Sequence, residues 1–253
     1  MRLTLAVVLW FFGMGVADAK IDFDATDDTI IVDSSATIDN QQPLTFASWI
    51  RPEGAGETAG RWFNKGAIGA ASGGVIVNLF DSGKEMTWNV DCDTTDMSYS
   101  TGGDMLTVNA WQAVVVTWDG GTDASDSAHM YVNGAEVTYQ DTGTNCATSV
   151  VSEAGENLHI GNRPATDRTF DGQITEFCMW DKVLDAQEIS LYSRSRVKGI
   201  CLQIAPSNLV LYPDMSSCDG ACTAAMVDLS QNDNTITPTN NPTGSGETVS
   251  SYP

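Results

Sequence analysis

A strand pattern that runs directly into a helix pattern constrains the fold of this chain more than any other stretch. Residues 170–194 read F-D-G-Q-I-T-E-F-C-M-W-D-K-V-L-D-A-Q-E-I-S-L-Y-S-R. Strict alternation divides the first half into two faces, one with Ile174, Cys178 and Trp180, the other with Thr175, Phe177 and Met179. Both faces are at least partly apolar, which is typical of a strand inside a packed sandwich.

The helix pattern begins where the strand pattern ends. Asp185 occupies an N-cap position and Glu188 follows three residues later, the spacing of a capping box. Leu184, Ile189 and Tyr192 can then share one helical face. The sequence therefore predicts a single short helix after a long series of strands.

Turn residues divide the rest of the chain into short alternating segments. Residues 21–23 and 29–32 predict an N-terminal hairpin around the Asp-rich residues 24–28. Residues 111–120 and 128–137 predict two further hairpins, the second turning at Asn133 and Gly134. Hydrophobic residues make up 42% of the chain and charged residues 18%, with 23 glycines. This balance indicates one large all-β domain with a substantial core.

The net charge excludes some partners. Twelve basic residues against 33 acidic ones give a formal charge of −21. Nucleic acid and anionic membrane surfaces would be repelled, so neither is expected as a partner.

The first residues predict export. Arg2 precedes an apolar run over residues 3–16, and Ala17, Asp18 and Ala19 form an A-x-A signal for cleavage before Lys20. We expect residues 1–19 to be a signal peptide and the mature chain, without a membrane span, to be extracellular, periplasmic or on the cell surface.

An even number of cysteines in an exported chain favours disulfides. Spacing alone leaves the pairing open. It suggests a local link between Cys218 and Cys222, a tie from Cys178 in the strand to Cys201 after the helix, and a link between Cys92 and Cys146.

Several motifs, taken in order, resemble one family. The run N-x-W-x-x-V-x-V-T-W-D-G from Asn109, then M-Y-V-N-G from Met130, L-H-I-G-N from Leu158 and the segment 170–194, resembles the laminin-G-like domains of the concanavalin A-like superfamily. The opening strand from Ile21 and L-T-F-A-S-W-I-R-P from Leu44 are also similar. The resemblance implies a two-sheet antiparallel jelly roll over residues 20–198. Residues 199–253 are expected to be an extension with one more strand at 208–212, a Cys-pinned loop and a polar tail.

The resemblance also implies a structural calcium ion between the opening strand and the I-D-E strand. Transferred to this chain, its ligands are Asp24, Asp27 or Asp28, and Glu176. Thr175 stands where the family pattern has an Asp, which removes one anionic ligand. An alternative is that these Asp residues only shape a turn.

Carbohydrate binding needs an exposed aromatic platform with amides nearby, because a sugar ring stacks its apolar face on a π surface. The candidates are Trp62, Trp88 with Asn89, and Tyr99, with Tyr139 as a further aromatic; core packing is the competing explanation.

Catalytic residues are not predicted. Glucanases of the superfamily carry an E-x-D-x-E strand that puts nucleophile and acid on one face, and neither this triplet nor a G-x-S-x-G motif occurs. The favoured function is a recognition or adhesion module that binds carbohydrate or an extracellular protein. The alternatives are a divergent glucanase or lyase and a structural surface or coat protein.

Overall fold

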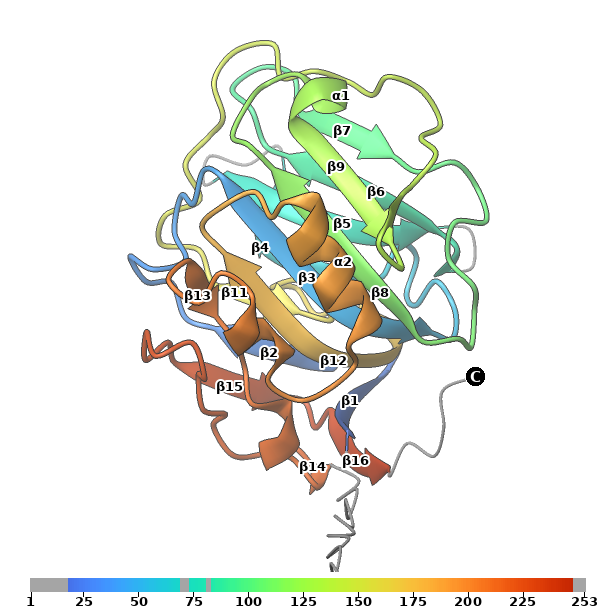
Figure 1. Cartoon of the computed structure of the whole chain (residues 1–253), viewed down its shortest axis with the longest axis vertical. Helices are drawn as coiled ribbons and strands as arrows, with labels where there is room; N and C mark the ends of the chain where they lie inside the picture. Colours follow the sequence, from blue (N-terminus) through green and yellow to red (C-terminus); the bar gives the residue numbers. More distant parts are fainter. Residues whose placement is uncertain (1–17, 69–72, 81–82, 248–253) are drawn as a thin grey trace, which may run out of the picture.

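Two antiparallel sheets form the chain's main structure, as the alternating segments predict. The computed structural model describes residues 18–68, 73–80 and 83–247 (Figure 1). Sheet A runs, in spatial order, through β10 (Ala135–Glu136), β9 (Ala128–Val132), β8 (Gln112–Trp118), β3 (Leu44–Pro52), β12 (Asp171–Trp180), β1 (Asp18–Asp24), β16 (Thr243–Glu247) and β14 (Gly220–Ala221), with β13 (Leu209–Leu211) also paired to β12. Sheet B runs through β15 (Ile236–Thr239), β2 (Thr29–Val32), β11 (Leu158–Ile160), β4 (Arg61–Gly66), β5 (Gly74–Phe80), β6 (Glu85–Val90) and β7 (Met97–Ser100). The jelly-roll prediction is confirmed.

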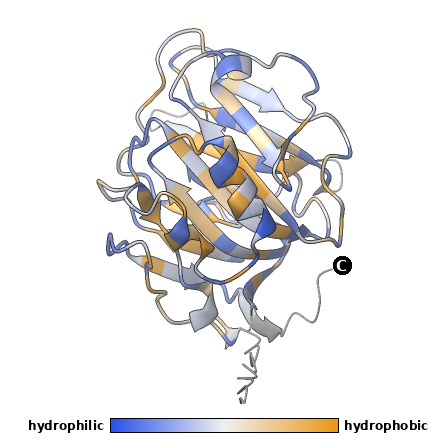
Figure 2. Ribbon diagram, in the orientation of Figure 1, coloured by the Kyte–Doolittle hydropathy of each residue, from blue (hydrophilic) through white to orange (hydrophobic). Residues whose placement is uncertain are grey.

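The main core lies between the sheets. Apolar side chains from alternate positions of both sheets pack there, and its aromatic centre places Phe46, Phe63 and Phe177 in ring contact. In Figure 2 the hydrophobic residues, in orange, follow the central strands β3, β8 and β12. Alternation therefore supplies one buried face per sheet, as expected for a sandwich.

The predicted helix covers the outer face of sheet A. This helix, α2 (Ala186–Arg194), begins at the Asp185 cap, and the capping box with Glu188 is present. Ile189 and Tyr192 pack with Trp180 in a second apolar cluster under the helix (Figure 1). The described part of the chain also contains a one-turn helix, α1 (Ala124–Ser127), and two 3₁₀ turns, η2 (Ile200–Gln203) and η3 (Met215–Ser217).

A bulge changes the alternation of β12. The register with β3 shifts between Thr175 and Cys178, and Glu176 takes a positive φ of 50°. The extra residue reverses the facing of the residues after it, so Ile174 and Phe177 both point into the main core while Cys178 joins the outer cluster. The division of faces by strict alternation is therefore wrong beyond Glu176.

The first two strands do not form the predicted hairpin. β1 pairs with β12 and β16 in sheet A, whereas β2 pairs with β11 and β15 in sheet B. Residues 25–28 carry the chain from one sheet to the other. Apolar side chains of both strands therefore reach the same core from opposite sides: Ile21 and Phe23 from sheet A, and Ile30 and Val32 from sheet B. A hairpin within one sheet would have the same alternation of apolar residues, so the sequence pattern does not distinguish the two arrangements.

The other turn and cysteine predictions are confirmed. β8, β9 and β10 are successive antiparallel neighbours, and Asn133 and Gly134 have positive φ values of 52° and 82° in the last turn. Disulfides join Cys92 to Cys146, Cys178 to Cys201 and Cys218 to Cys222.

Residues of the expected extension add strands to both sheets. β13 pairs with β12, confirming the strand predicted at 208–212, and β15 and β16 pair with β2 and β1. The predicted signal peptide, apart from residues 18 and 19 of β1, lies outside the described residues. Within those residues, no helix has the length and apolarity needed to cross a membrane.

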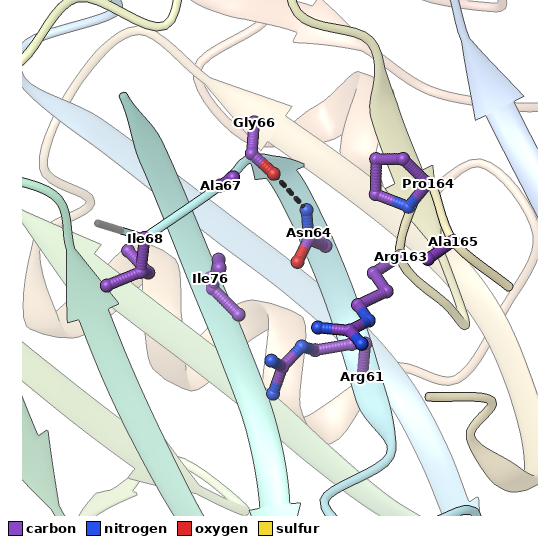
Figure 3. Close-up of a pocket in the computed structure, with 9 residues that line it drawn as sticks. All are labelled: Arg61, Asn64, Gly66, Ala67, Ile68, Ile76, Arg163, Pro164 and Ala165. Carbon is purple, nitrogen blue, oxygen red and sulfur yellow. Dashed lines mark hydrogen bonds between the residues drawn. The ribbon is translucent and has the colours of Figure 1, made fainter. Parts of the chain in front are cut away.

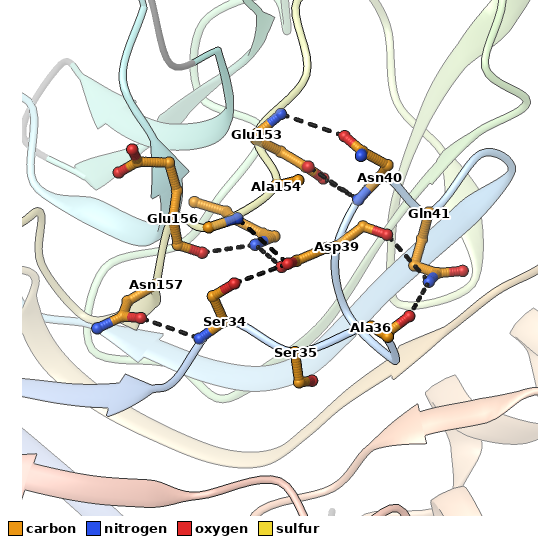
Figure 4. A network of polar contacts seen from close by, with 12 residues as sticks. Ser34, Ser35, Ala36, Asp39, Asn40, Gln41, Glu153, Ala154, Glu156 and Asn157 are labelled. Carbon is orange, nitrogen blue, oxygen red and sulfur yellow. Dashed lines mark hydrogen bonds and ion pairs between the residues drawn. The ribbon is translucent and has the colours of Figure 1, made fainter.

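A buried ion pair fastens two loops at one end of the sandwich. Lys65 Nζ lies 2.7 Å from Asp39 Oδ1 and donates to the carbonyl of Glu156 at 2.6 Å. Ser34 Oγ donates to the other Asp39 oxygen at 2.6 Å, and the Glu153 carboxylate accepts from the Asn40 backbone N–H at 2.8 Å (Figure 4). Burial alone would raise the pKa of Asp39, but the hydrogen bonds that Asp39 accepts from Lys65, Ser34 and the Gly155 backbone N–H outweigh it and hold the pKa below its usual value. The network links the β2–β3 loop to the segment before β11.

Candidate functional site

The predicted calcium ligands fall in two places. Asp24, Asp27 and Asp28 lie together at the sheet-crossing turn, where Asp28 Oδ2 accepts from the Asp24 backbone N–H at 3.0 Å. Burial, assisted by the charges of Asp24 and Asp27, raises the pKa of Asp28 to about 6, although the hydrogen bond from Asp24 N–H lowers it. Glu176 lies five residues along β12 from the partner of Asp24, roughly 15 Å away at strand spacing.

Glu176 is instead bound to the elements that cover sheet A. Its carboxylate accepts from Tyr212 Oη at 2.6 Å and from the Gly199 backbone N–H at 3.2 Å, and its carbonyl accepts from Tyr192 Oη. The structure therefore does not assemble the four predicted residues into one site. Residues 18–68, 73–80 and 83–247 hold no group of three or more His, Cys, Asp or Glu side chains suited to a metal ion. Calcium binding itself stays a prediction.

The predicted aromatic platform is wrong, because its rings belong to the core. Trp62 and Trp88 are both 0% exposed, and Tyr99 is 5% exposed and stacks on Tyr139 at 4.0 Å between ring centroids. A bulge between Arg61 and Phe63 turns Trp62 inward beside Phe63. Trp62, Trp88 and Tyr99 therefore leave no stacking surface for a sugar, and Tyr99 covers one face of the half-buried Tyr139.

A groove lies on the opposite face of the same strands. Two adjoining hollows, of about 330 and 640 Å³, share Arg61, Ile68 and Ile76 on the outer face of sheet B. Their remaining described lining consists of amides, hydroxyls, short apolar groups and charged ends: Thr58, Ala59, Asn64, Gly66, Ala67, Asn78, Phe80, Glu85, Thr87, Asn89, Arg163, Pro164, Ala165, Arg168, Ser98 and Ser100. Of the predicted residues, Asn89 alone is among them.

The floor of the groove is an ordered polar surface. Asn89 Nδ2 donates to Asn78 Oδ1 at 3.0 Å, and the Thr87 and Ser100 hydroxyls lie 2.8 Å apart. Asn64 donates to the Gly66 carbonyl at 2.6 Å, and Figure 3 shows it between Ile76 and the Arg163 loop. Phe80 is 39% exposed at the end of β5, next to this floor. Neutral donors and acceptors beside an exposed ring suit a hydroxyl-rich ligand.

His159 lies beside the groove, paired with Asn64 across β11 and β4. It is 6% exposed, and burial lowers the pKa of its imidazole to about 4. Because the unfolded chain takes up this proton near pH 6.5, stability is retained above that pH and lost as the pH falls toward about 4.

We expect wild-type protein to lose up to about 3 kcal/mol of unfolding free energy between those two pH values through His159. His159→Gln should flatten this part of the pH profile, measured by urea unfolding at several pH values. Replacing His129, which is half-buried and pairs with Glu136, with Gln is the control for the chemical change. An unchanged slope in His159→Gln would contradict the assignment.

Known proteins were compared with the chain in sequence and in fold. No curated protein matches the chain significantly. Among solved structures, the chain is similar to a "putative carbohydrate binding protein" from Bacteroides ovatus ATCC 8483, at 15% identity and a TM-score of 0.60, covering 90% of this chain and 59% of that one. It is also similar to the binding domain of botulinum neurotoxin serotype G, at 15% identity and a TM-score of 0.50, covering 69% and 42%. Mouse laminin alpha1 domains LG4-5 match at 13% identity and a TM-score of 0.48, covering 74% and 47%.

The family follows from the sequence match. A laminin G family model, described as concanavalin A-like lectin/glucanases superfamily, matches residues 24–190. This range includes both sheets except for β1, of which it contains only Asp24, and the strands added at the C-terminal end. The chain therefore belongs to the laminin-G-like family of the concanavalin A-like lectin/glucanases superfamily.

Proposed function

We propose that this chain is a secreted, non-catalytic recognition module that binds carbohydrate in the groove of sheet B. The observation that carries the proposal is the groove lining, in which Asn78, Asn89, Thr87 and Ser100 present neutral hydrogen-bonding groups beside the exposed ring of Phe80. A sugar needs this combination, since its hydroxyls seek amides and hydroxyls while its C–H face packs on a ring.

The lining argues against glycoside hydrolysis. Most glycosidases use a pair of carboxylates on either side of the scissile bond. Among the described residues that line the two hollows, Glu85 is the one carboxylate. A single acid can accept a sugar hydroxyl but does not supply the acid and the nucleophile together.

Two further observations support the proposal. The similar solved structures include a "putative carbohydrate binding protein" and a toxin binding domain, although at 15% identity they share the fold alone. Three disulfides and the A-x-A segment at residues 17–19 support export.

The test is a glycan array probed with the purified mature chain, once with calcium and once with chelator. We expect binding to a restricted set of glycans. Phe80→Ala should weaken that binding about 2- to 10-fold, because it removes the stacking surface, and titration calorimetry would measure the change. Leu191→Ala is the matched control, since Leu191 is a similarly exposed apolar residue on α2, which covers sheet A.

Two results would contradict the proposal. One is the absence of any glycan binding under both conditions, which would favour a structural surface protein. The other is measurable turnover of a bound polysaccharide, which would favour a divergent enzyme. A difference between the calcium and chelator arms would test the predicted ion at the same time.

A further inference from the structure

Three of the chain's seven arginines meet at one end of the groove. Arg61 begins β4, and Arg163 and Arg168 lie on the loop between β11 and β12. Figure 3 shows the guanidinium groups of Arg61 and Arg163 next to each other, both directed over β4 toward Ile76. This concentration of positive charge stands out in a chain of net charge −21.

The three guanidinium groups are not equally neutralised. Asp167 binds the Nε and Nη2 atoms of Arg163 in a two-point ion pair. Arg168 donates through Nη1 to the Thr58 carbonyl, which is uncharged. Arg61 forms no ion pair within the described part of the chain, and its buried Nε has no hydrogen-bond partner there. Arg61 Nη1 donates to the uncharged Ala59 carbonyl at 3.4 Å, and neither Asp167 nor Glu85, the one carboxylate in the described lining, forms an ion pair with Arg61.

The electrostatics of Arg61 agree with this geometry. Burial first, and then the charges of Arg163 and Arg168, lower the pKa of Arg61 to about 10, while Asp167 acts in the opposite direction. Like charges held together at a partly buried position are costly unless an anion joins them. The cluster is therefore suited to receive negative charge from a ligand.

The loop that carries two of the arginines is held in place by a buried amide. Asn162 is 0% exposed, and its Oδ1 accepts from the backbone N–H groups of Arg163 at 2.8 Å and Arg168 at 3.1 Å. The Arg61 backbone N–H also donates to the Arg168 carbonyl at 2.8 Å. The backbone that carries the three arginines is thus fixed before any ligand arrives, which reduces the entropy lost on binding.

From this arrangement we infer that the sugar bound in the groove is acidic, with its anionic group, a carboxylate or a sulfate, held by Arg61 together with Arg163 and Arg168. This inference rests on the proposed carbohydrate-binding function and specifies the ligand class at one end of the same groove. The guanidinium fork matches carboxylate and sulfate oxygens geometrically, so these groups are the chemistry that Arg61 recognises. The neutral floor of Asn78, Asn89 and Thr87 would then contact the ring hydroxyls.

Pairs of oligosaccharides that differ only in the acidic group measure how much that group contributes to binding. We would titrate the chain with an oligouronide and its carboxyl-reduced form, and with a sulfated glucan oligosaccharide and its unsulfated parent. We expect at least one acidic ligand to bind roughly 10-fold or more tightly than its neutral partner, with the difference shrinking at high salt. The pair that shows the difference identifies the carboxylate or the sulfate as the source of the charge.

Variants then assign the preference to the arginines. Arg61→Gln should weaken binding of the acidic ligand roughly 10- to 100-fold and leave the neutral partner nearly unchanged. Arg61→Lys should retain part of the affinity, because it keeps the charge and loses the fork. Arg194→Gln, on the exposed end of α2, removes the same charge away from the groove and should have little effect.

The outcomes distinguish the two proposals. Equal binding of acidic and neutral partners, or an equal loss of both in Arg61→Gln, would overturn the acidic-ligand inference and leave carbohydrate binding in place. Failure of every oligosaccharide to bind would overturn both. Thermal unfolding of each variant checks that a loss of binding is not a loss of folded protein.

Discussion

Replacing Lys65 with alanine is expected to lower the free energy of unfolding by about 3–5 kcal/mol. The side chain of Lys65 is 2% exposed, and its ammonium group is paired with Asp39 and bound to the Glu156 carbonyl. Removing it leaves the Asp39 carboxylate, only 15% exposed, without its counter-charge in a site with little access to water. Equilibrium urea unfolding, followed by tryptophan fluorescence, measures the loss.

Lys84→Ala is the matched control for the same chemical change. Lys84 Nζ pairs with Asp104 at 2.9 Å, but the two side chains are 41% and 75% exposed. A surface ion pair of this kind contributes about 0–1 kcal/mol, because water and salt screen it. Equal losses in Lys65→Ala and Lys84→Ala would contradict the view that burial makes the Lys65 pair important.

A double variant separates the ion pair from the packing of the lysine chain. Lys65→Met keeps most of the aliphatic stem, and combining it with Asp39→Asn removes both charges together. We expect the double variant to be more stable than Lys65→Met alone, because the Asp39 charge is no longer left without its counter-charge, while the buried Glu153 carboxylate loses the attraction of Lys65 equally in both variants. If the double variant were the less stable one, Asp39 would be held mainly by Ser34 and Gly155 and not by Lys65.

Much of the fold could be predicted because its signals are local. The α2 capping box, the Asn133 and Gly134 turn and the positions of the strands along the chain each depend on residues close together in sequence. The first strand pair could not be predicted in this way. A chain that reverses within one sheet and a chain that crosses between two sheets use the same Asp-rich turn and the same apolar positions.

The candidate site shows where alternation helps and where it fails. Trp88 and Asn89 are neighbours on β6, so they face opposite sides of the sheet and cannot serve one ligand together. The aromatic member is in the core and the amide lines the groove. Alternation could have found this division in β6, but not in β4 or β12, where bulges shift the facing without a clear sequence signal.

The arginine cluster had no sequence signal at all. Arg61 is about a hundred residues from Arg163 and Arg168, and the pairing of β11 with β4 brings them together. In the sequence, none of the three arginines belongs to a motif that marks it as part of a binding site. Only the sheet order, and the Asn162 hydrogen bonds that shape the loop, turn three separate charges into one surface.

The second large stability effect is expected from the disulfides, and it should follow their spacing in the chain. Cys92 and Cys146 are 54 residues apart, whereas Cys218 and Cys222 are four apart. A longer loop loses more conformational freedom when the unfolded chain is cross-linked, so Cys92→Ala/Cys146→Ala should cost about 4 kcal/mol and Cys218→Ala/Cys222→Ala about 2 kcal/mol. Urea unfolding of the two double variants against wild type measures both values.

The dependence of unfolding on urea distinguishes the two ways in which these bonds can stabilise the protein. If Cys92–Cys146 acts by restricting the unfolded chain, its removal lets that chain expand, and the slope of free energy against urea should increase. Because all four cysteines are less than 9% exposed, loss of sulfur packing alone would give similar costs for the two variants and unchanged slopes. Equal costs would therefore contradict the loop-length explanation, while a larger cost with a steeper slope for the 54-residue link would support it.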